Sequence, residues 1–257
     1  MRIIFVLVLI ISFAHNSKSQ TLDFSTWKQD SLPTGKRLSY ANLSSNNWIF
    51  VKKGNKVIIE ENNFKSDKGD ELPFTKEFIA KNLEEIEGNR FVKEVEKGFL
   101  IGLNHGEFGG GLLFVSNDGL TSYKIGEFLR IKDIFEWNSR IYAIEGLAHL
   151  GSSNGQIIEI FKENGSWKYK TLSKLIEAPA LIAKANNQQI IITSQYILRL
   201  TANLEIEEIL KAPFYWGVLY PSSIHIENKT LYLAMRQGVL EIENFETTPK
   251  YRWYIKK

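Results

Sequence analysis

The chain has 257 residues, of which 44% are hydrophobic and 12% aromatic, enough to bury a substantial core without covalent cross-links. The 32 lysines and arginines nearly balance the 29 acidic residues, which argues against general binding to nucleic acid or to an anionic membrane. The absence of cysteine excludes disulfides, thiolate metal sites and a cysteine nucleophile.

The N-terminus has the layout of a secretory signal. Arg2 precedes an apolar run over residues 3–14, and a polar stretch with small residues follows before a cut that would leave Gln20 first. The alternative is a membrane anchor, but a spanning helix needs about 20 apolar residues and this run is shorter. We therefore expect residues 1–19 to be a removed signal peptide and residues 20–257 to be a single secreted or periplasmic domain.

One unit recurs five times along the rest of the chain. It is an apolar run, a short polar or glycine-containing corner and a second apolar run, and it begins at Trp48, Phe99, Ile141, Ile190 and Leu231. The second runs are in register at Ile58, Leu113, Ile158, Leu198 and Leu240. The steps between these positions are 55, 45, 40 and 42 residues. Such a period, with four short strands in each unit, is typical of propeller blades.

The strands are predicted from β-branched and aromatic enrichment and from turn residues between the runs. In the fourth unit, residues 180–185 are followed by Asn186-Asn187 and a second strand that is apolar at consecutive positions. This pattern is expected of a strand that neighbouring sheets cover on both faces.

The first step is longer because residues 62–85 are inserted between the first two units. The first half of this segment is polar, and the spacing of Phe78, Ile79 and Leu83 predicts a short helix over residues 75–86. No Pro-rich or Ser-rich linker divides the chain, so the insertion is interpreted as an excursion from one domain.

On this strand rhythm, residues 35–257 resemble the β-propeller superfamily, and more particularly secreted five-bladed propellers. The chain carries no Trp-Asp repeat motif, no kelch double glycine and no repeated Asp box, and the lack of the last argues against a sialidase-like or glycosidase propeller. The resemblance implies an all-β propeller of about five four-stranded blades. Their expected ranges are near 35–85, 88–127, 130–173, 179–211 and 221–257.

In a four-stranded blade, the corner between strands two and three lies on the same face as the crossing to the next blade. Residues 102–111, with a glycine triplet that permits positive φ, are one such corner, and residues 145–155 are the next. The crossing over residues 212–223 leads to a further corner at 235–238. We expect these segments to bring one ligand-binding set together: His105, Glu107, Glu145, His149, Tyr215, Trp216, Tyr220 and Arg236.

Aromatic rings beside a few polar groups suit a sugar, a peptide or another polar ligand. The expected function is therefore an exported, non-enzymatic binding module for a carbohydrate, peptide or protein partner. Structural alternatives remain open, because the aromatic residues of the crossing would also pack it onto its own blade, and Arg236 would also pair with Glu107 or Glu145.

The alternative function is a secreted hydrolase or lyase with His105, Glu107, Glu145 and His149 as its acid, base or ligand set. No nucleophile elbow, Walker loop or dinucleotide fingerprint is present. The spacing of the two His and two Glu residues matches no zinc motif, and residues 66–71 and 116–119 lack the spacing of a calcium loop. We expect no metal and no cofactor. His225 is interpreted as a strand residue that faces the channel or a neighbouring blade.

Overall fold

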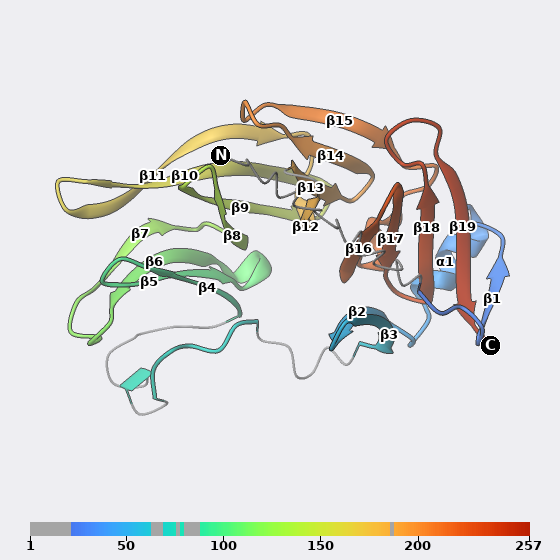
Figure 1. Cartoon of the computed structure of the whole chain (residues 1–257), viewed down its shortest axis with the longest axis horizontal. Helices are drawn as coiled ribbons and strands as arrows, with labels where there is room; N and C mark the ends of the chain where they lie inside the picture. The colour runs from blue at the N-terminus through green and yellow to red at the C-terminus, as the bar shows by residue number, and fades with distance from the viewer. Residues whose placement is uncertain (1–21, 63–68, 76–77, 80–87, 186–187) are drawn as a thin grey trace, which may run out of the picture.

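The computed structural model describes residues 22–62, 69–75, 78–79, 88–185 and 188–257. Its strands form separate antiparallel sheets arranged side by side about an axis (Figure 1). The predicted all-β, propeller-like fold of about five blades is confirmed. The proposed signal peptide lies outside the described residues, and most of the predicted helix over 75–86 does as well.

Four of the sheets contain four consecutive strands. The first strands of successive sheets contact one another, which places them innermost. Blade 2 contains β4 (Asn89–Val95), β5 (Gly98–Asn104), β6 (Gly110–Ser116) and β7 (Ser122–Glu127). Blade 3 contains β8 (Ile131–Trp137), β9 (Arg140–His149), β10 (Ser152–Glu163) and β11 (Ser166–Leu175). Blade 4 contains β12 (Pro179–Ala185), β13 (Gln188–Thr193), β14 (Tyr196–Leu200) and β15 (Ile206–Lys211). Blade 5 contains β16 (Ser223–Glu227), β17 (Thr230–Ala234), β18 (Gly238–Glu243) and β19 (Lys250–Lys256).

The N-terminal region departs from the predicted pattern. Within the described residues, blade 1 has only two strands, β2 (Trp48–Lys53) and β3 (Lys56–Glu61), instead of the expected four. The unpredicted strand β1 (Trp27–Asp30) pairs with β19 as a fifth strand of blade 5. The short helix α1 (Lys36–Asn42), also unpredicted, follows it and contacts the crossing between blades 4 and 5.

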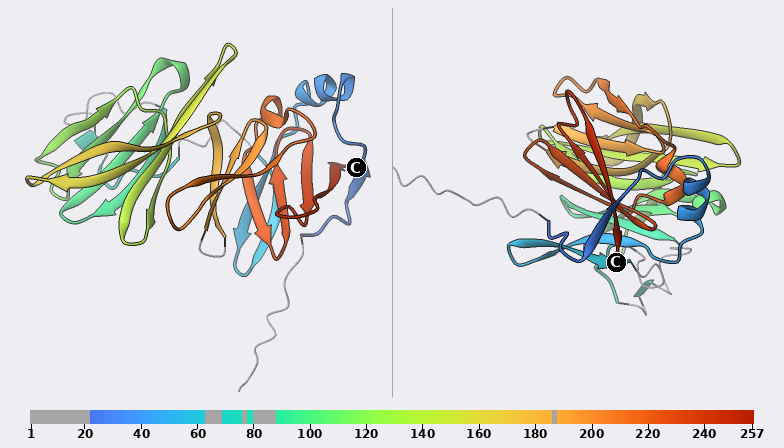
Figure 2. Two further views of the ribbon diagram at one scale, coloured as in Figure 1. Left: turned by 90° about the horizontal axis from the view of Figure 1, so that it is seen from above. Right: turned by 90° about the vertical axis from the view of Figure 1, so that its right-hand side faces the viewer.

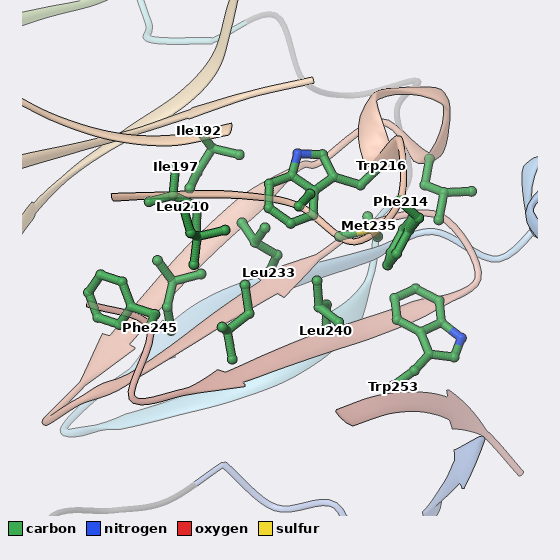
Figure 3. Packing of buried hydrophobic residues seen from close by; sticks show 14 of the residues in the cluster. Ile192, Ile197, Leu210, Phe214, Trp216, Leu233, Met235, Leu240, Phe245 and Trp253 are labelled. Atoms are coloured by element: carbon green, nitrogen blue, oxygen red, sulfur yellow. The ribbon is translucent and has the colours of Figure 1, made fainter. Parts of the chain in front are cut away.

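Apolar clusters between successive blades hold the sheets together. In β13, Ile191 packs toward blade 3, whereas Ile190 and Ile192 pack toward blade 5, and all three are buried. Successive side chains of a strand point to opposite faces, so a strand covered on both faces is apolar at consecutive positions, as these three isoleucines are. The largest cluster lies between blades 4 and 5, where Leu233 and Leu240 meet the residues of blade 4 (Figure 3).

The connections at the two ends of the sheets differ. The end that carries the corners between strands two and three and the crossings between blades is called here the corner end, and the opposite end is called the turn end. The 3-10 helices η1 (Gly106–Phe108) and η2 (Trp216–Leu219) belong to the corner end. Figure 2 shows η1, the β9–β10 corner, η2 and α1 at this one end of the molecule.

Candidate binding site at the corner end

Two hollows open at the corner end in the described part of the chain. Hollow 1, of about 570 Å³, lies at the β5–β6 corner and the β7–β8 crossing, with His105, Phe108 and Phe128 in its wall. Hollow 2, of about 440 Å³, lies between the corners and crossings of blades 3, 4 and 5, with His149 and Tyr220 in its wall. The predicted segments thus do meet at one end.

Glu107 and His149 come from neighbouring blades and are in direct contact. Glu107 lies in η1, and His149 is the last residue of β9. The Nε2 atom of His149 lies 2.7 Å from Oε2 of Glu107, and both side chains are partly exposed, at 40% and 44%. This contact links the corners of blades 2 and 3 beside hollow 2.

Glu145 holds a crossing in place. Its Oε2 atom accepts a hydrogen bond of 3.2 Å from the backbone N–H of Arg130, which begins the entry into blade 3. The Arg130 side chain in turn donates to the carbonyl oxygens of Gly106, at 3.3 Å, and Phe128, at 2.7 Å. Glu145 and Arg130 therefore fix the backbone between the two hollows.

His105 is exposed at the wall of hollow 1. Its backbone N–H donates to the carbonyl of Gly109 at 2.9 Å, and its ring centroid lies 5.4 Å from that of Phe108. Of the glycine triplet, Gly109 has the expected positive φ, at 126°. Gly110 is required for another reason, because a Cβ there would lie 2.2 Å from the Leu129 carbonyl oxygen.

Trp216 is a core residue and offers no surface to a ligand. Its exposed fraction is 0%, and its Nε1 donates to the Thr193 carbonyl at 2.8 Å. The indole packs in the cluster between blades 4 and 5 with Phe214 and Met235 (Figure 3). The packing alternative therefore holds for this residue, since an apolar side chain in a crossing over a buried sheet edge gains most from burial.

Tyr215 and Tyr220, from the same crossing, are 41% and 55% exposed and line hollow 2. The guanidinium carbon of Arg236 lies 4.5 Å from the Tyr220 ring centroid, which is a cation–π contact. Arg236 pairs with neither of the two glutamates considered from the sequence. Its Nη1 atom donates to the backbone and side-chain oxygens of Asn42, at 2.6 and 2.9 Å. Arg236 thus supports Tyr220 and ties the C-terminal end of α1 to blade 5.

Lys132 is a residue of hollow 2 that the sequence did not single out. It is the second residue of β8, the innermost strand of blade 3, and is partly buried. Burial lowers the pKa of its ammonium group from the usual 10.5. The available signal was a Lys132-Asp133 pair between Ile131 and Ile134 at the start of the strand. Only the arrangement of three blades shows that the lysine lines a hollow.

Exposed apolar side chains gather at the corner end. Among the described residues, Leu120 is the one exposed large hydrophobic side chain that lies away from the corner end and α1. Those at the corner end or on α1 beside it are Tyr40, Leu43, Phe108, Phe128, Leu150, Ile176, Tyr215 and Tyr220. Three of them also have left-handed backbone: Phe128 at φ 60°, Leu150 at 47° and Tyr220 at 53°. Bulky residues rarely adopt this conformation.

His225 faces a neighbouring blade, which is one of the two positions expected from the sequence; the other was the channel. Its ring centroid lies 6.0 Å from that of Tyr232 and 6.0 Å from that of Phe50 in blade 1. Burial lowers the pKa of the imidazole. The packing makes His225 a structural residue of the interface between blades 5 and 1.

Among the described residues, no group of three or more His, Asp or Glu side chains is placed to hold a metal ion. In the same part of the chain, no helix has the length and apolar character needed to cross a membrane.

No family model and no curated protein matches the chain. Among solved structures, it is similar to virginiamycin B lyase from Staphylococcus aureus, with 16% identity and a TM-score of 0.42 over 66% of this chain and 56% of that one. A putative 6-phosphogluconolactonase from Bacteroides uniformis has 14% identity and a TM-score of 0.43 over 65% and 56%. The N-terminal domain of Nup159 has 10% identity and a TM-score of 0.37 over 81% and 51%. The chain thus spans about half the length of these structures.

Proposed function

We propose that the protein is an exported, non-enzymatic module that binds a peptide segment of a partner protein at its corner end. The observation that carries this proposal is the combination, at Phe128, Leu150 and Tyr220, of a left-handed backbone with an exposed side chain. Such a backbone costs about 1 kcal/mol or more for a residue other than glycine. Because these side chains are exposed, burial in the protein's own core does not offset that cost.

The exposed side chains favour a peptide over a carbohydrate. Leu150 is 91% exposed and Ile176 is 55% exposed, and aliphatic side chains offer a sugar neither a ring to stack on nor a hydrogen bond. Apolar residues of a peptide gain free energy by contact with them. Tyr215 and Tyr220 add rings with a polar edge, which are common in peptide-binding surfaces.

The test is selection from a random peptide display library on the immobilised protein, followed by calorimetry with the enriched peptides. Leu150→Gly should weaken binding at least about ten-fold, the effect of removing one good apolar contact, while the melting temperature stays unchanged or rises. Leu120→Gly is the matched control, since it removes an exposed leucine from the turn end. A library that yields no enriched peptide, or equal affinity for the Leu150→Gly protein, would contradict the proposal.

Export is part of the same proposal. The layout of residues 1–19 supports it. Expression of the full chain in a bacterium followed by fractionation should give a mature protein in the exported fraction that begins at Gln20. An uncut precursor in the cytosol would refute this part alone.

A hydrolase or lyase is the second candidate, and the contact between Glu107 and His149 favours it. A carboxylate that orients an imidazole is a common element of acid–base sites. The candidate predicts turnover in a panel of nitrophenyl esters and glycosides that Glu107→Gln removes. Absence of any turnover that depends on Glu107 would leave the binding proposal in place.

A further inference from the structure

We infer that Lys132 is the anion-binding residue of hollow 2 and that it takes a carboxylate of the bound peptide. This inference rests on the proposed function and assigns a chemical group to one position of its ligand. The occupant is a peptide in which an apolar side chain lies next to a carboxylate, either an acidic side chain or the C-terminus.

The backbone of β8 directs Lys132 into the hollow. Ile131 pairs with Glu145 of β9 and Asp133 pairs with Ile144, so that Lys132 is the extra residue of a β-bulge. A bulge leaves its extra residue outside the ladder and changes the direction of its side chain, and bulges are enriched beside binding sites. The side chain of Lys132 accordingly lies in the wall of hollow 2.

Blade 4 has a β-bulge at the same place in its first strand, but the extra residue there is uncharged. In β12, Pro179 pairs with Thr193 and Leu181 with Ile192, so Ala180 is the extra residue at the same place in the strand. Ala180 also lines hollow 2. The bulges of two neighbouring innermost strands therefore both face hollow 2. Lys132 gives the hollow a positive charge, and the small side chain of Ala180 leaves room for a ligand.

The ammonium group has no counter-ion in the described part of the chain. No carboxylate there lies within ion-pair distance of it, and the acids of the surrounding segments have other partners. Glu145 accepts from the Arg130 N–H, and Glu107 contacts His149. Glu177 accepts from the Thr193 hydroxyl at 2.8 Å and from the Gln195 N–H at 3.1 Å. A partly desolvated cation without a partner gains free energy from a bound anion.

The other residues that line hollow 2 favour an apolar group next to the bound anion. Leu150, Tyr215 and Tyr220 line the same space and present apolar surface to it. A hydrated inorganic anion would leave that surface uncovered, whereas a carboxylate with an adjoining apolar side chain would fill both parts. The arrangement therefore fits N-acetyl-leucine as a minimal probe of the peptide group.

The experiment is an NMR titration of protein with ¹³C-labelled lysines, in which the Lys132 signal is assigned by Lys132→Met. N-acetyl-leucine should shift this signal in a saturable way, and the neutral N-acetyl-leucinamide should bind at least about ten-fold more weakly, as expected for loss of a charge-assisted hydrogen bond. Lys124→Met, which removes a lysine of hollow 1, is the matched control and should leave binding unchanged. Lys132→Arg should keep the preference for the acid.

The outcomes separate this inference from the proposed function. An unmoved Lys132 signal at saturating probe, with enriched peptides that bind the Lys132→Met protein as tightly as the unchanged one, overturns the inference but leaves peptide binding intact. Tighter Lys132-dependent binding of glucuronate than of N-acetyl-leucine overturns the peptide assignment. A ten-fold loss of peptide affinity in Lys132→Met, at a melting temperature that is unchanged or raised, supports the inference. Loss of peptide binding in Leu150→Gly tests the proposed function separately.

Discussion

Both ends of the blades contain residues with a left-handed backbone, but the residue types at these positions differ between the two ends. At the turn end, the left-handed positions of four hairpins are held by Asn138, Asn164, Asn228 and Asn244. Asparagine tolerates this conformation because its short polar side chain bonds locally. At the corner end the corresponding strain falls on exposed phenylalanine, leucine and tyrosine. Turn formation alone therefore does not explain the corner end.

Two leucines make the contrast sharper. Leu204, at the turn end, has φ 66° and packs its side chain against the cluster between blades 3 and 4. Leu150, at the corner end, has φ 47° and is 91% exposed. Burial offsets the backbone strain at Leu204, whereas the free protein has no such compensation at Leu150. This difference is what a surface kept for a partner would produce.

The largest expected effect concerns two aromatic residues of one crossing. Trp216→Ala should lower the free energy of unfolding by about 3–5 kcal/mol, because it empties a fully buried site and removes the bond to Thr193. Tyr220→Ala should change it by less than about 1 kcal/mol, since that ring is 55% exposed. Urea unfolding measures both. Similar losses in the two variants would show that Tyr220 is a packing residue and not a part of the binding surface.

The next effect concerns the glycines of hollow 1. Gly110→Ala should destabilise the protein by about 1–3 kcal/mol, because its Cβ would lie 2.2 Å from the Leu129 carbonyl oxygen and 2.6 Å from that of Leu103. Gly111→Ala should have a smaller effect, since the nearest atom would lie at 3.2 Å. Thermal melts compare the two. Equal tolerance of both substitutions would mean that the corner is looser than its contacts indicate.

Substitution by glycine should change the free energy of unfolding in opposite directions at Leu150 and Leu204, the two leucines with left-handed backbone. Leu150→Gly should raise the free energy of unfolding by up to about 1 kcal/mol, because glycine adopts positive φ without strain. Leu204→Gly should lower it, since contacts with the cluster between blades 3 and 4 are lost. Denaturant titrations of the two variants test the comparison. A loss of stability in Leu150→Gly would assign that side chain a structural role.

The smallest effect is the pH dependence at Lys132. Because burial lowers the pKa of this lysine in the folded protein, the folded state binds fewer protons than the unfolded state between the lowered value and 10.5. The charge therefore destabilises the protein fully below the lowered pKa, and the destabilisation disappears as the pH rises toward 10.5. Lys132→Met should be more stable than the unchanged protein at pH 7, with a gap that narrows in alkali. Melting temperatures from pH 7 to 10 measure it.

A turn-end lysine is the control for this titration. Lys162 lies 3.0 Å from Oε2 of Glu96 and over the Trp167 ring. Lys162→Met should give no gain in stability at pH 7, because it removes a paired and exposed charge. The same gain in both variants would mean that the hollow contributes nothing to the effect at Lys132.

The repeat of apolar runs and turn residues predicted most of the fold and part of the candidate site. The consecutive apolar residues of the fourth unit predicted β13 as a strand covered on both faces, and Ile190, Ile191 and Ile192 alternate between two clusters as that requires. The convergence of corners and crossings on one end followed from the repeat, which is why His149 and Tyr220 were expected together. The two-stranded blade 1 was not predicted, since apolar runs do not show how many strands the intervening segment supplies.

The roles of single side chains were decided by contacts between segments distant in the chain. Nothing in the local pattern separates Trp216 from Tyr220, yet one is buried under Thr193 and the other is exposed over Arg236. Arg236 was expected in the ligand-binding set or, as the structural alternative, paired with a glutamate. It bonds instead to Asn42, a residue of a helix that the sequence did not predict. Local periodicity cannot predict such pairs.

The amino-acid sequence by itself determined that this chain is an all-β repeat structure and which end gathers its corners, because the alternation of apolar residues and turn residues acts over only a few positions. Only the tertiary structure decided which of those corner residues are buried and which are strained and exposed. It also decided that Lys132 lines a hollow and has no counter-ion among the described residues. The physical reason is that burial, charge compensation and β-bulge direction depend on neighbouring blades, whose residues lie tens of positions away in the chain.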